Sequence, residues 1–387
     1  MIAIPGWREA GRHGEQRNRE ARMATEREYR RPGRTTLALC AALACAACAW
    51  RAQTPVSQPA TAYVSSETGG IAVIDLGRLE IARTLDTGGK GPRGIGISAD
   101  GRYLLAANKG TSDLSVIDTR DGQLVRRIPI GKNPEFVRVS GGQAFVTYEP
   151  GERNGPPGAE PAPAAGKPAQ ARDGAPVPAE IAVIDLKDWR VTRAIPSGLE
   201  TEGIEFSPDA RLLLVTNEGD DTVSVYERAS GRRLNLLKTP PGSRPRGIKV
   251  SPDGRRYIVT LESANAFLVL DAADYRVLRT VPTRAGPYGV AFDRAGERLF
   301  VAASRADTIQ VFDAGSYENI ANIATGKRCW HFSFTPDDAR LLIACGRSNA
   351  VYVVDARSYQ PLREIAGVAL TWGIVTFPKS PGTLDAP

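Results

Sequence analysis

Short apolar segments recur along the chain at an almost constant spacing, and each ends in an acidic residue. They read IAVID, LSVID, IAVID, VSVYE, FLVLD, IQVFD and VYVVD, and they end at Asp75, Asp118, Asp185, Glu227, Asp271, Asp313 and Asp355. Five of the six intervals are 42 to 44 residues long, and the remaining one is 67. Repetition at this period indicates a fold built from seven copies of one supersecondary unit.

Each unit contains four segments with strand character, as residues 247–281 illustrate. GIKV leads through the turn Ser-Pro-Asp-Gly to YIVT, and FLVLD and YRVLRTV follow. Proline and glycine supply the backbone angles of a tight hairpin. A continuous apolar third segment is typical of a buried strand, and alternation in the fourth indicates an exposed edge. Four antiparallel strands in each unit predict an all-β fold whose units are β-propeller blades.

The two ends of the repeat region complement each other. The chain enters the repeat at TAYVS (61–65), which corresponds to a second strand, and leaves it after WGIVTF (372–377), which corresponds to a first strand. Pairing of strand 372–377 with the N-terminal blade completes the last set of four and protects the exposed edges. We therefore predict a closed, seven-bladed propeller of four-stranded antiparallel blades over residues 62–377. An open solenoid is the alternative.

The repeated phrases resemble a known family. Gly-x-x-Pro-x-Gly-Ile, Ser-Pro-Asp-Gly and segments similar to Val-Ser-Val-Ile-Asp resemble the YVTN-type β-propeller repeat over residues 62–377. The ending WGIVTFPKSPGTLD resembles the propellers associated with PQQ-dependent alcohol catabolism. The first resemblance implies the propeller fold. The second implies an accessory of a periplasmic quinoprotein or of its transport system.

The N-terminal region has the pattern of an export signal. An Arg-rich stretch precedes the apolar run LALCAALACAACAW (37–50), which is shorter than the ~20 residues that span a bilayer. The basic approach and the small residues at its end predict a signal peptide over residues 1–49, with Met23 as an alternative start. A linker (50–61) follows, and the mature chain is expected in the periplasm without a transmembrane segment. A buried core helix, or a lipid anchor on Cys45 or Cys48, is the alternative.

The single long interval holds an insertion rich in proline, alanine and glycine at residues 149–179. This composition cannot bury a core and predicts a loop. Residues 378–387 form a C-terminal tail. Removal of residues 1–49, with nine Arg and five Glu, lowers the net charge from +7 to +3. A net charge as small as +3 argues against a nucleic-acid partner.

Propeller geometry places the residue at the start of each first strand on one face, at the mouth of the central channel. These residues are Arg93, Glu135, Glu202, Arg246, Tyr288, Trp330 and Trp372. The exits of the second strands add Glu67, Lys109, Tyr148, Glu149, Asn217, Glu218, Glu262 and Arg305 to the same face. Aromatic planes can stack on a flat ligand, and arginines can pair with its carboxylates. Alternatively, these residues are blade junctions that plug the channel.

His331 belongs to the same candidate ligand-binding face. It and His13 are the two histidines of the chain, which excludes a site built from several imidazoles. It stands where five blades have glycine. An imidazole there could be an axial ligand to a haem-like cofactor or a general base, or it could simply fill space.

Two further groups of residues have candidate chemistry. Glu67, Glu149, Glu218 and Glu262 recur at one structural position, which suggests either calcium or carboxyls with raised pKa values. The diameter of the ring argues against a single ion, and we expect no metal. Cys329 and Cys345 flank a hairpin that turns near Asp337. We predict a disulfide between them in an oxidising compartment, with two buried thiols as the alternative.

The sequence contains no nucleotide-binding glycine loop, nucleophile elbow or zinc-binding spacing. We therefore expect an exported, monomeric, non-enzymatic binding or scaffold protein without a cofactor, with an enzyme as the alternative. Its partner is either a periplasmic protein or a small flat or anionic ligand. A lactonase-like hydrolase that uses His331 with Glu135, Glu202 and Arg246 is one alternative. A carrier of a tetrapyrrole or quinone cofactor is the other.

Overall fold

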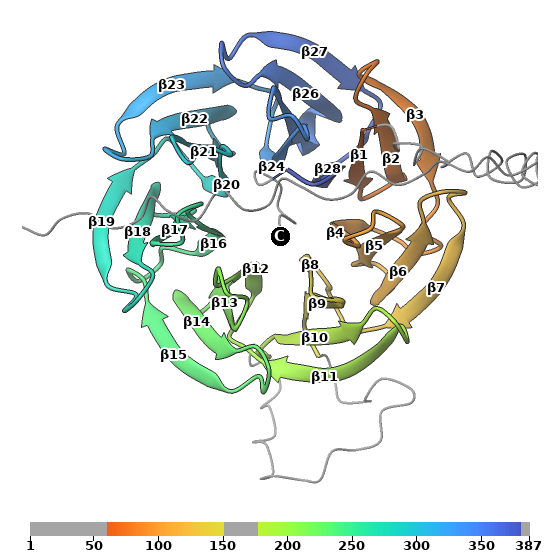
Figure 1. Ribbon diagram of the computed structural model, residues 1–387, viewed down its shortest axis with the longest axis horizontal. Coiled ribbons are helices and arrows are strands. Elements are labelled where there is room, and N and C mark those ends of the chain that lie inside the picture. The colour runs from red at the N-terminus through yellow and green to blue at the C-terminus, as the bar shows by residue number, and fades with distance from the viewer. Residues whose placement is uncertain (1–59, 151–176, 381–387) are drawn as a thin grey trace, which may run out of the picture. The chain divides into compact units, whose positions relative to one another are not determined.

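Seven β-sheets surround a central axis in the computed structural model, which describes residues 60–150 and 177–380 (Figure 1). Every sheet in this part of the chain has four antiparallel strands. The predicted all-β, seven-bladed propeller is confirmed. A single 3-10 turn, η1 (Gly346–Ser348), is the only helix among these residues, and no helix there is long and apolar enough to cross a membrane.

Several expected segments lie outside the described residues. They are the signal peptide (1–49), the linker up to residue 59, most of the insertion (151–176) and the end of the C-terminal tail (381–387). Their boundaries stay predictions.

Each blade runs from an inner first strand to an outer fourth strand. The first strands are β4 (Pro92–Ile97), β8 (Val137–Ser140), β12 (Thr201–Phe206), β16 (Pro245–Val250), β20 (Pro287–Phe292), β24 (Cys329–Phe334) and β28 (Thr371–Phe377). The second are β5 (Tyr103–Asn108), β9 (Gln143–Tyr148), β13 (Leu212–Asn217), β17 (Arg256–Leu261), β21 (Arg298–Ala303), β25 (Arg340–Cys345) and β1 (Thr61–Ser66). The third are β6 (Asp113–Asp118), β10 (Glu180–Asp185), β14 (Thr222–Glu227), β18 (Ala266–Asp271), β22 (Thr308–Asp313), β26 (Ala350–Asp355) and β2 (Gly70–Asp75). The fourth are β7 (Leu124–Pro129), β11 (Arg190–Pro196), β15 (Arg233–Lys238), β19 (Val277–Pro282), β23 (Asn319–Ala324), β27 (Pro361–Ala366) and β3 (Glu80–Leu85).

The ring closes where the two ends of the repeat region meet. β28 pairs antiparallel with β1, and Ala62 lies opposite Thr376 and Val64 opposite Ile374. The closing blade therefore has the order β28-β1-β2-β3, so the predicted pairing of strand 372–377 with the N-terminal blade is confirmed. Val64 and Ile374 are completely buried and pack in one cluster with Leu342 of the preceding blade.

The acidic residue at the end of the third strand shapes the turn that follows. Asp75 Oδ1 accepts hydrogen bonds from the backbone N–H groups of Gly77 at 2.8 Å and Arg78 at 3.0 Å. Asp313 and Asp355 accept the equivalent pair of bonds two and three residues further on. These are Asx turns, in which a short carboxylate replaces a backbone acceptor. The acidic repeat therefore has a structural role in these hairpins.

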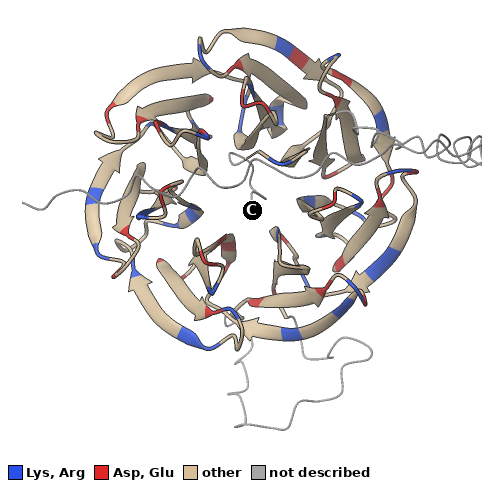
Figure 2. Cartoon of the chain, viewed as in Figure 1, with Lys and Arg blue, Asp and Glu red and all other residues tan. Residues whose placement is uncertain are grey.

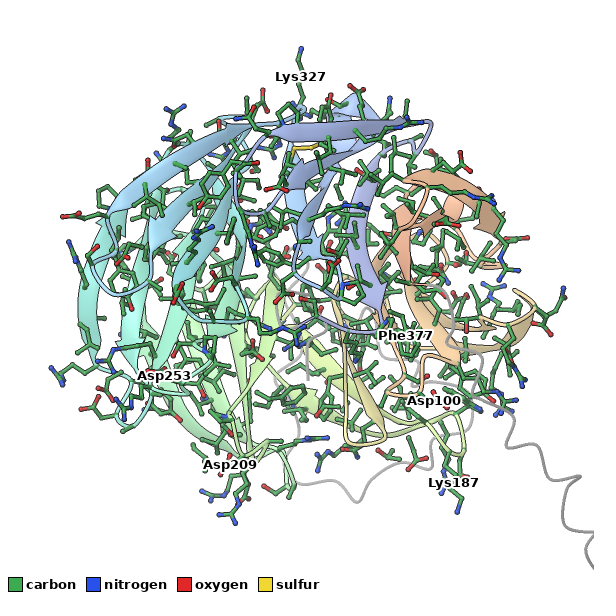
Figure 3. The ribbon with its side chains drawn as sticks, turned by 45° about the horizontal axis from the view of Figure 1, so that its top comes forward. Asp100, Lys187, Asp209, Asp253, Lys327 and Phe377 are labelled. Carbon is green, nitrogen blue, oxygen red and sulfur yellow. A yellow bond between two sulfur atoms is a disulfide. The ribbon has the colours of Figure 1, made fainter. Side chains whose placement is uncertain are left out.

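The loops distinguish two faces of the ring. Turns between first and second strands carry Asp100, Asp209 and Asp253, whereas Lys327 lies in the loop before a first strand. Figure 3 shows Lys327 at the opposite end of the molecule from Asp209. We call the face that carries the starts of the first strands the mouth face.

Replacing Ile374 by alanine tests the closure of the ring. Removing a completely buried isoleucine side chain should lower the free energy of unfolding by about 2–5 kcal/mol. Ile320 on β23 is 52% exposed, so Ile320→Ala is a matched control that should change it by less than about 0.5 kcal/mol. Urea denaturation measures both. Equally small effects would contradict the closure.

Candidate functional site

Seven equivalent residues gather around the channel on the mouth face. Each stands at the start of a first strand, and all seven line one cavity of about 520 Å³. They are Arg93, Glu135, Glu202, Arg246, Tyr288, Trp330 and Trp372. The structure therefore brings together seven of the eight residues predicted to line this face. That they bind a ligand stays a prediction.

Glycine follows the mouth residue in five of the seven blades, because neighbouring inner strands approach closely there. A Cβ atom on Gly94 would lie 2.1 Å from the carbonyl oxygen of Glu135, and one on Gly247 would lie 2.3 Å from that of Tyr288. No side chain fits such a gap, so glycine marks close backbone approach. The five glycines are Gly94, Gly203, Gly247, Gly289 and Gly373.

Hydroxyl groups of the second strands hold the same carbonyl groups. Ser65 Oγ donates a hydrogen bond of 2.5 Å to the carbonyl oxygen of Arg93. Thr216 and Thr260 donate bonds of 2.6 Å to the carbonyl oxygens of Arg246 and Tyr288. Each of these mouth residues is therefore fixed in position by the preceding blade.

The rest of the cavity wall is mostly charged. Figure 2 shows basic and acidic segments on the strands and loops nearest the centre of the ring. The remaining lining residues are Glu67, Lys109, Asn133, Tyr148, Glu149, Ala179, Glu200, Thr201, Glu218, Arg244, Arg328, Arg347 and Leu370. Five of the predicted second-strand exits are among them, whereas Asn217, Glu262 and Arg305 are not.

Arg246 is the centre of the largest charge network. Its Nη1 forms ion pairs with Glu202 and Glu218, and its Nε lies 2.8 Å from Glu262 Oε2. Its guanidinium lies 4.9 Å from the centroid of the Tyr288 ring. Burial opposes its charge, but Tyr288, Glu202 and Glu262 favour it more strongly, so the pKa of Arg246 is raised. Arg246 therefore stays a fixed cation.

Arg93 is the centre of a second network. Its Nε lies 3.0 Å from Glu67 Oε1, and its Nη1 forms an ion pair with Glu135. Lys109 Nζ lies 3.7 Å from the same oxygen of Glu135. Two cations therefore lie against Glu135. The pKa of Arg93 is raised because the charges of Glu135 and Glu67 outweigh the effect of burial.

Glu202 connects the two networks. Its burial raises its pKa, and repulsion from Glu135 and a hydrogen bond with that residue add to the effect, so that the pKa of Glu202 reaches about 8 although Arg246 opposes the rise. Tyr288 Oη donates a hydrogen bond of 3.2 Å to Glu202 Oε2. At neutral pH Glu202 therefore keeps its proton, and it lies beside a second carboxyl group, that of Glu135. Such a pair can supply an acid and a base to one reaction.

His331 lies beneath the cavity and not in its wall. It is 3% exposed, and its ring contacts those of Phe136, Tyr288 and Trp372 with centroids 6.1, 5.2 and 4.4 Å away. Neither ring nitrogen has a hydrogen-bond partner among the described residues, and the adjacent void of about 20 Å³ has room for one water. Burial, with the charge of Arg246, lowers the pKa of His331 to about 3. His331 is therefore a neutral, enclosed ring, too weak a base at neutral pH for the catalytic role considered above.

The sequence reasoning missed a second set of lining residues, two positions before the mouth residues. We call this the rim position, and its φ is positive in every blade. Its occupants and their φ values are Gly91 (68°), Asn133 (50°), Glu200 (49°), Arg244 (54°), Gly286 (70°), Arg328 (54°) and Leu370 (46°). Glycine in two blades is the sequence signal that was available, because glycine adopts this conformation without strain. All five larger occupants line the cavity.

The recurrent glutamates bind cationic or amide groups of the protein. Glu67, Glu218 and Glu262 each pair with an arginine, and Glu149 Oε1 accepts a hydrogen bond of 3.0 Å from Asn133. Within residues 60–150 and 177–380, no group of three or more His, Cys, Asp or Glu side chains could hold a metal ion. The geometry supports a charge network in place of the calcium site considered above.

A disulfide joins Cys329, at the start of β24, to Cys345, at the end of β25. The two cysteines are partners in the strand register, and Figure 3 shows the bond in yellow below Lys327. The pairing continues beyond the strands, because the N–H of Arg347 donates a hydrogen bond of 3.1 Å to the carbonyl oxygen of Lys327. The bridge therefore anchors the wall segment that carries Arg328 and Arg347.

Parts of the sequence match two known families. Residues 201–360 match the family described as Lactonase, 7-bladed beta-propeller, and residues 53–142 match the Cytochrome D1 heme domain. Each match covers fewer than half of the residues. They support membership of a β-propeller family, and neither identifies the YVTN type or the PQQ-associated subfamily. No curated protein matches the sequence.

Solved structures similar to the chain include two with lactonase names. The periplasmic gluconolactonase of Pseudomonas aeruginosa is 20% identical with a TM-score of 0.65, and the match covers 82% of this chain and 98% of that one. A Bacteroides uniformis protein described as a 6-phosphogluconolactonase is 17% identical with a TM-score of 0.65 and coverage of 82% and 100%. Hydrazine synthase of Kuenenia stuttgartiensis is 19% identical with a TM-score of 0.63 and coverage of 77% and 92%. At these identities the likeness shows the fold alone.

Glu202→Gln tests the raised pKa, because glutamine mimics the protonated carboxyl. The pKa of a glutamate in the unfolded chain is ~4.3, whereas that of Glu202 in the folded protein is about 8. Between these two pH values the folded protein therefore binds more protons than the unfolded chain does. The wild type should therefore lose stability relative to the variant as pH rises from 5 to 8.5, by about 1–4 kcal/mol. Urea denaturation at both pH values measures this. Glu364→Gln, on the exposed outer strand β27, is the control, and an identical pH dependence in all three proteins would contradict the assignment.

Proposed function

We propose that this protein is a lactonase-like hydrolase whose active site is the mouth-face cavity. The observation that carries the proposal is the carboxyl pair of Glu135 and Glu202, held between Arg93 and Arg246 in a cavity of about 520 Å³. The partial match to a lactonase family and the lactonase names among similar structures support it.

The residues of the cavity fit the chemistry of ester-ring opening. In our proposal, the carboxylate of Glu135 takes a proton from the attacking water as its oxygen bonds to the acyl carbon. Arg93 and Arg246 stabilise the negative charge that develops on the carbonyl oxygen. The carboxyl of Glu202 donates its proton to the ring oxygen as the acyl–oxygen bond breaks, which yields a hydroxy acid. Glu135 then returns its proton to Glu202.

We propose that the protein acts in the periplasm. The N-terminal signal pattern supports this location, and so does the disulfide, because such bonds persist in oxidising compartments. One of the similar structures is itself a periplasmic protein.

A non-enzymatic binding protein, including an accessory of a quinoprotein, is the second candidate. The pairing of Arg93 and Arg246 with glutamates favours this candidate. Charges that neutralise one another in this way can stabilise the ring of blades without taking part in catalysis. A tetrapyrrole carrier is supported by the partial match to a haem domain. The enclosed position of His331 argues against iron ligation by that residue.

Hydrolysis of a panel of sugar lactones tests the proposal. The wild type should open glucono-lactones, and Glu202→Gln should lower kcat by about 100-fold or more because the proton donor is lost. The rate of the wild type should also fall as pH rises through about 8, where Glu202 loses its proton. Initial rates can be followed by acid release at constant pH.

Glu364→Gln on β27 is the matched control, because it makes the same substitution on an exposed outer strand and should hydrolyse at the wild-type rate. Full activity in Glu202→Gln would overturn the mechanism. Absence of hydrolysis by the wild type across the panel would favour the binding protein.

A further inference from the structure

Two arginines of the cavity differ from the others in lacking a carboxylate partner. Arg244 pairs with Glu200 and Glu218, and the arginines at the mouth positions are paired as well. Arg328 and Arg347 also line the cavity, but neither forms an ion pair with any residue that the structure describes. Their charges are therefore available to a ligand.

The carboxylate whose charge favours the Arg328 guanidinium, that of Glu262, already has other partners. The charge of Glu262 favours the guanidinium of Arg328, but Glu262 Oε1 accepts a hydrogen bond of 3.0 Å from Arg305 and Oε2 accepts one of 2.8 Å from Arg246. Arg328 Nε is buried and has no hydrogen-bond partner among the described groups. The Arg328 guanidinium lies 5.7 Å from the ring centroid of Trp330, which limits its movement on one side.

The backbone conformation of Arg328 is strained. Arg328 occupies the rim position with φ of 54°, where two other blades have glycine and four have another residue. A left-handed residue other than glycine stores strain of ~1 kcal/mol or more, and such residues cluster at ligand-binding sites.

The fold also places these two like charges in the wall of one cavity. Arg328 precedes Cys329, and Arg347 follows Cys345 by two residues. The disulfide therefore links the segment that carries Arg328 to the segment that carries Arg347. Burial lowers the pKa of Arg328, and the nearby charges of Arg347 and Arg305 lower it further. The disulfide keeps the two arginine segments linked although the arginines repel each other. A bound anion would offset this repulsion.

We infer that Arg328 and Arg347 form an oxyanion-binding site that holds a phosphate or carboxylate group of a molecule in the mouth-face cavity. Guanidinium groups bind both anions through paired N–H donors, and rigid placement lowers the entropy cost of binding. The site goes beyond the proposed hydrolysis, because it binds a group away from the reacting carbonyl and does not require turnover.

Calorimetric titration with inorganic phosphate and with malonate at low ionic strength tests the site. The wild type should bind at least one of the two anions, and the tighter one identifies the preferred group. Arg328→Gly should weaken binding by about tenfold or more, since a hydrogen bond to a charged group is worth ~1.5–3 kcal/mol. Its melting temperature should be unchanged or higher, because glycine accepts a φ of 54° without strain.

Leu370→Gly is the matched control, because it makes the same change of backbone strain at the rim position of another blade without removing a charge. It should bind anions as the wild type does. If Arg328→Gly fails to fold, Arg347→Gln decides the question, since Arg347 is exposed and its loss should weaken binding without unfolding.

No binding by the wild type, or equal binding by Arg347→Gln and the wild type, would overturn the inference. Because anion binding is measured without turnover, its failure is separate from a failure of lactone hydrolysis.

Discussion

Close backbone approach between neighbouring inner strands is the constraint on which the mouth face depends. A side chain at Gly94 or Gly247 would collide with a carbonyl oxygen of the next blade, and hydroxyl groups such as that of Thr260 bind the same carbonyls. In five of the seven blades, the blade therefore sets the position of the next mouth residue. The pairing of β28 with β1 carries this constraint around the whole ring, because it supplies the last inner strand from the other end of the chain (Figure 1).

This geometry brings charges of both signs from different blades into one cavity. Most of them pair, as Arg246 does with three glutamates, because an unpaired buried charge is costly. The chemistry we propose depends on two groups of residues whose charges are not fully paired. Glu202 keeps its proton because it is buried and lies beside Glu135, and Arg328 and Arg347 lack carboxylates to neutralise them. The first group provides a proton donor and the second an attachment point for an anion.

The scaffold stabilises both groups through rigid elements. Inner strands carry Glu202 and Arg246, and the disulfide holds the loops of Arg328 and Arg347. Functional groups on strands and stapled segments keep their positions better than groups on free loops. Beneath them, the aromatic cluster around His331 closes the channel below the cavity. A lone histidine, the most obvious candidate in the sequence, therefore packs the floor, and the acid–base pair that we propose consists of carboxyl groups.

The sequence by itself determined the number of blades, the strands of each blade, the closing strand and the seven mouth residues. These follow from turn residues, apolar alternation and a regular period, which are properties of short segments. Only the tertiary structure decided that His331 lies under the cavity, that Glu202 meets Glu135, and that Arg244, Arg328 and Leu370 occupy a strained rim position. These features depend on distances of a few ångströms between different blades. No local pattern records such distances, because they result from how all seven blades pack around the axis.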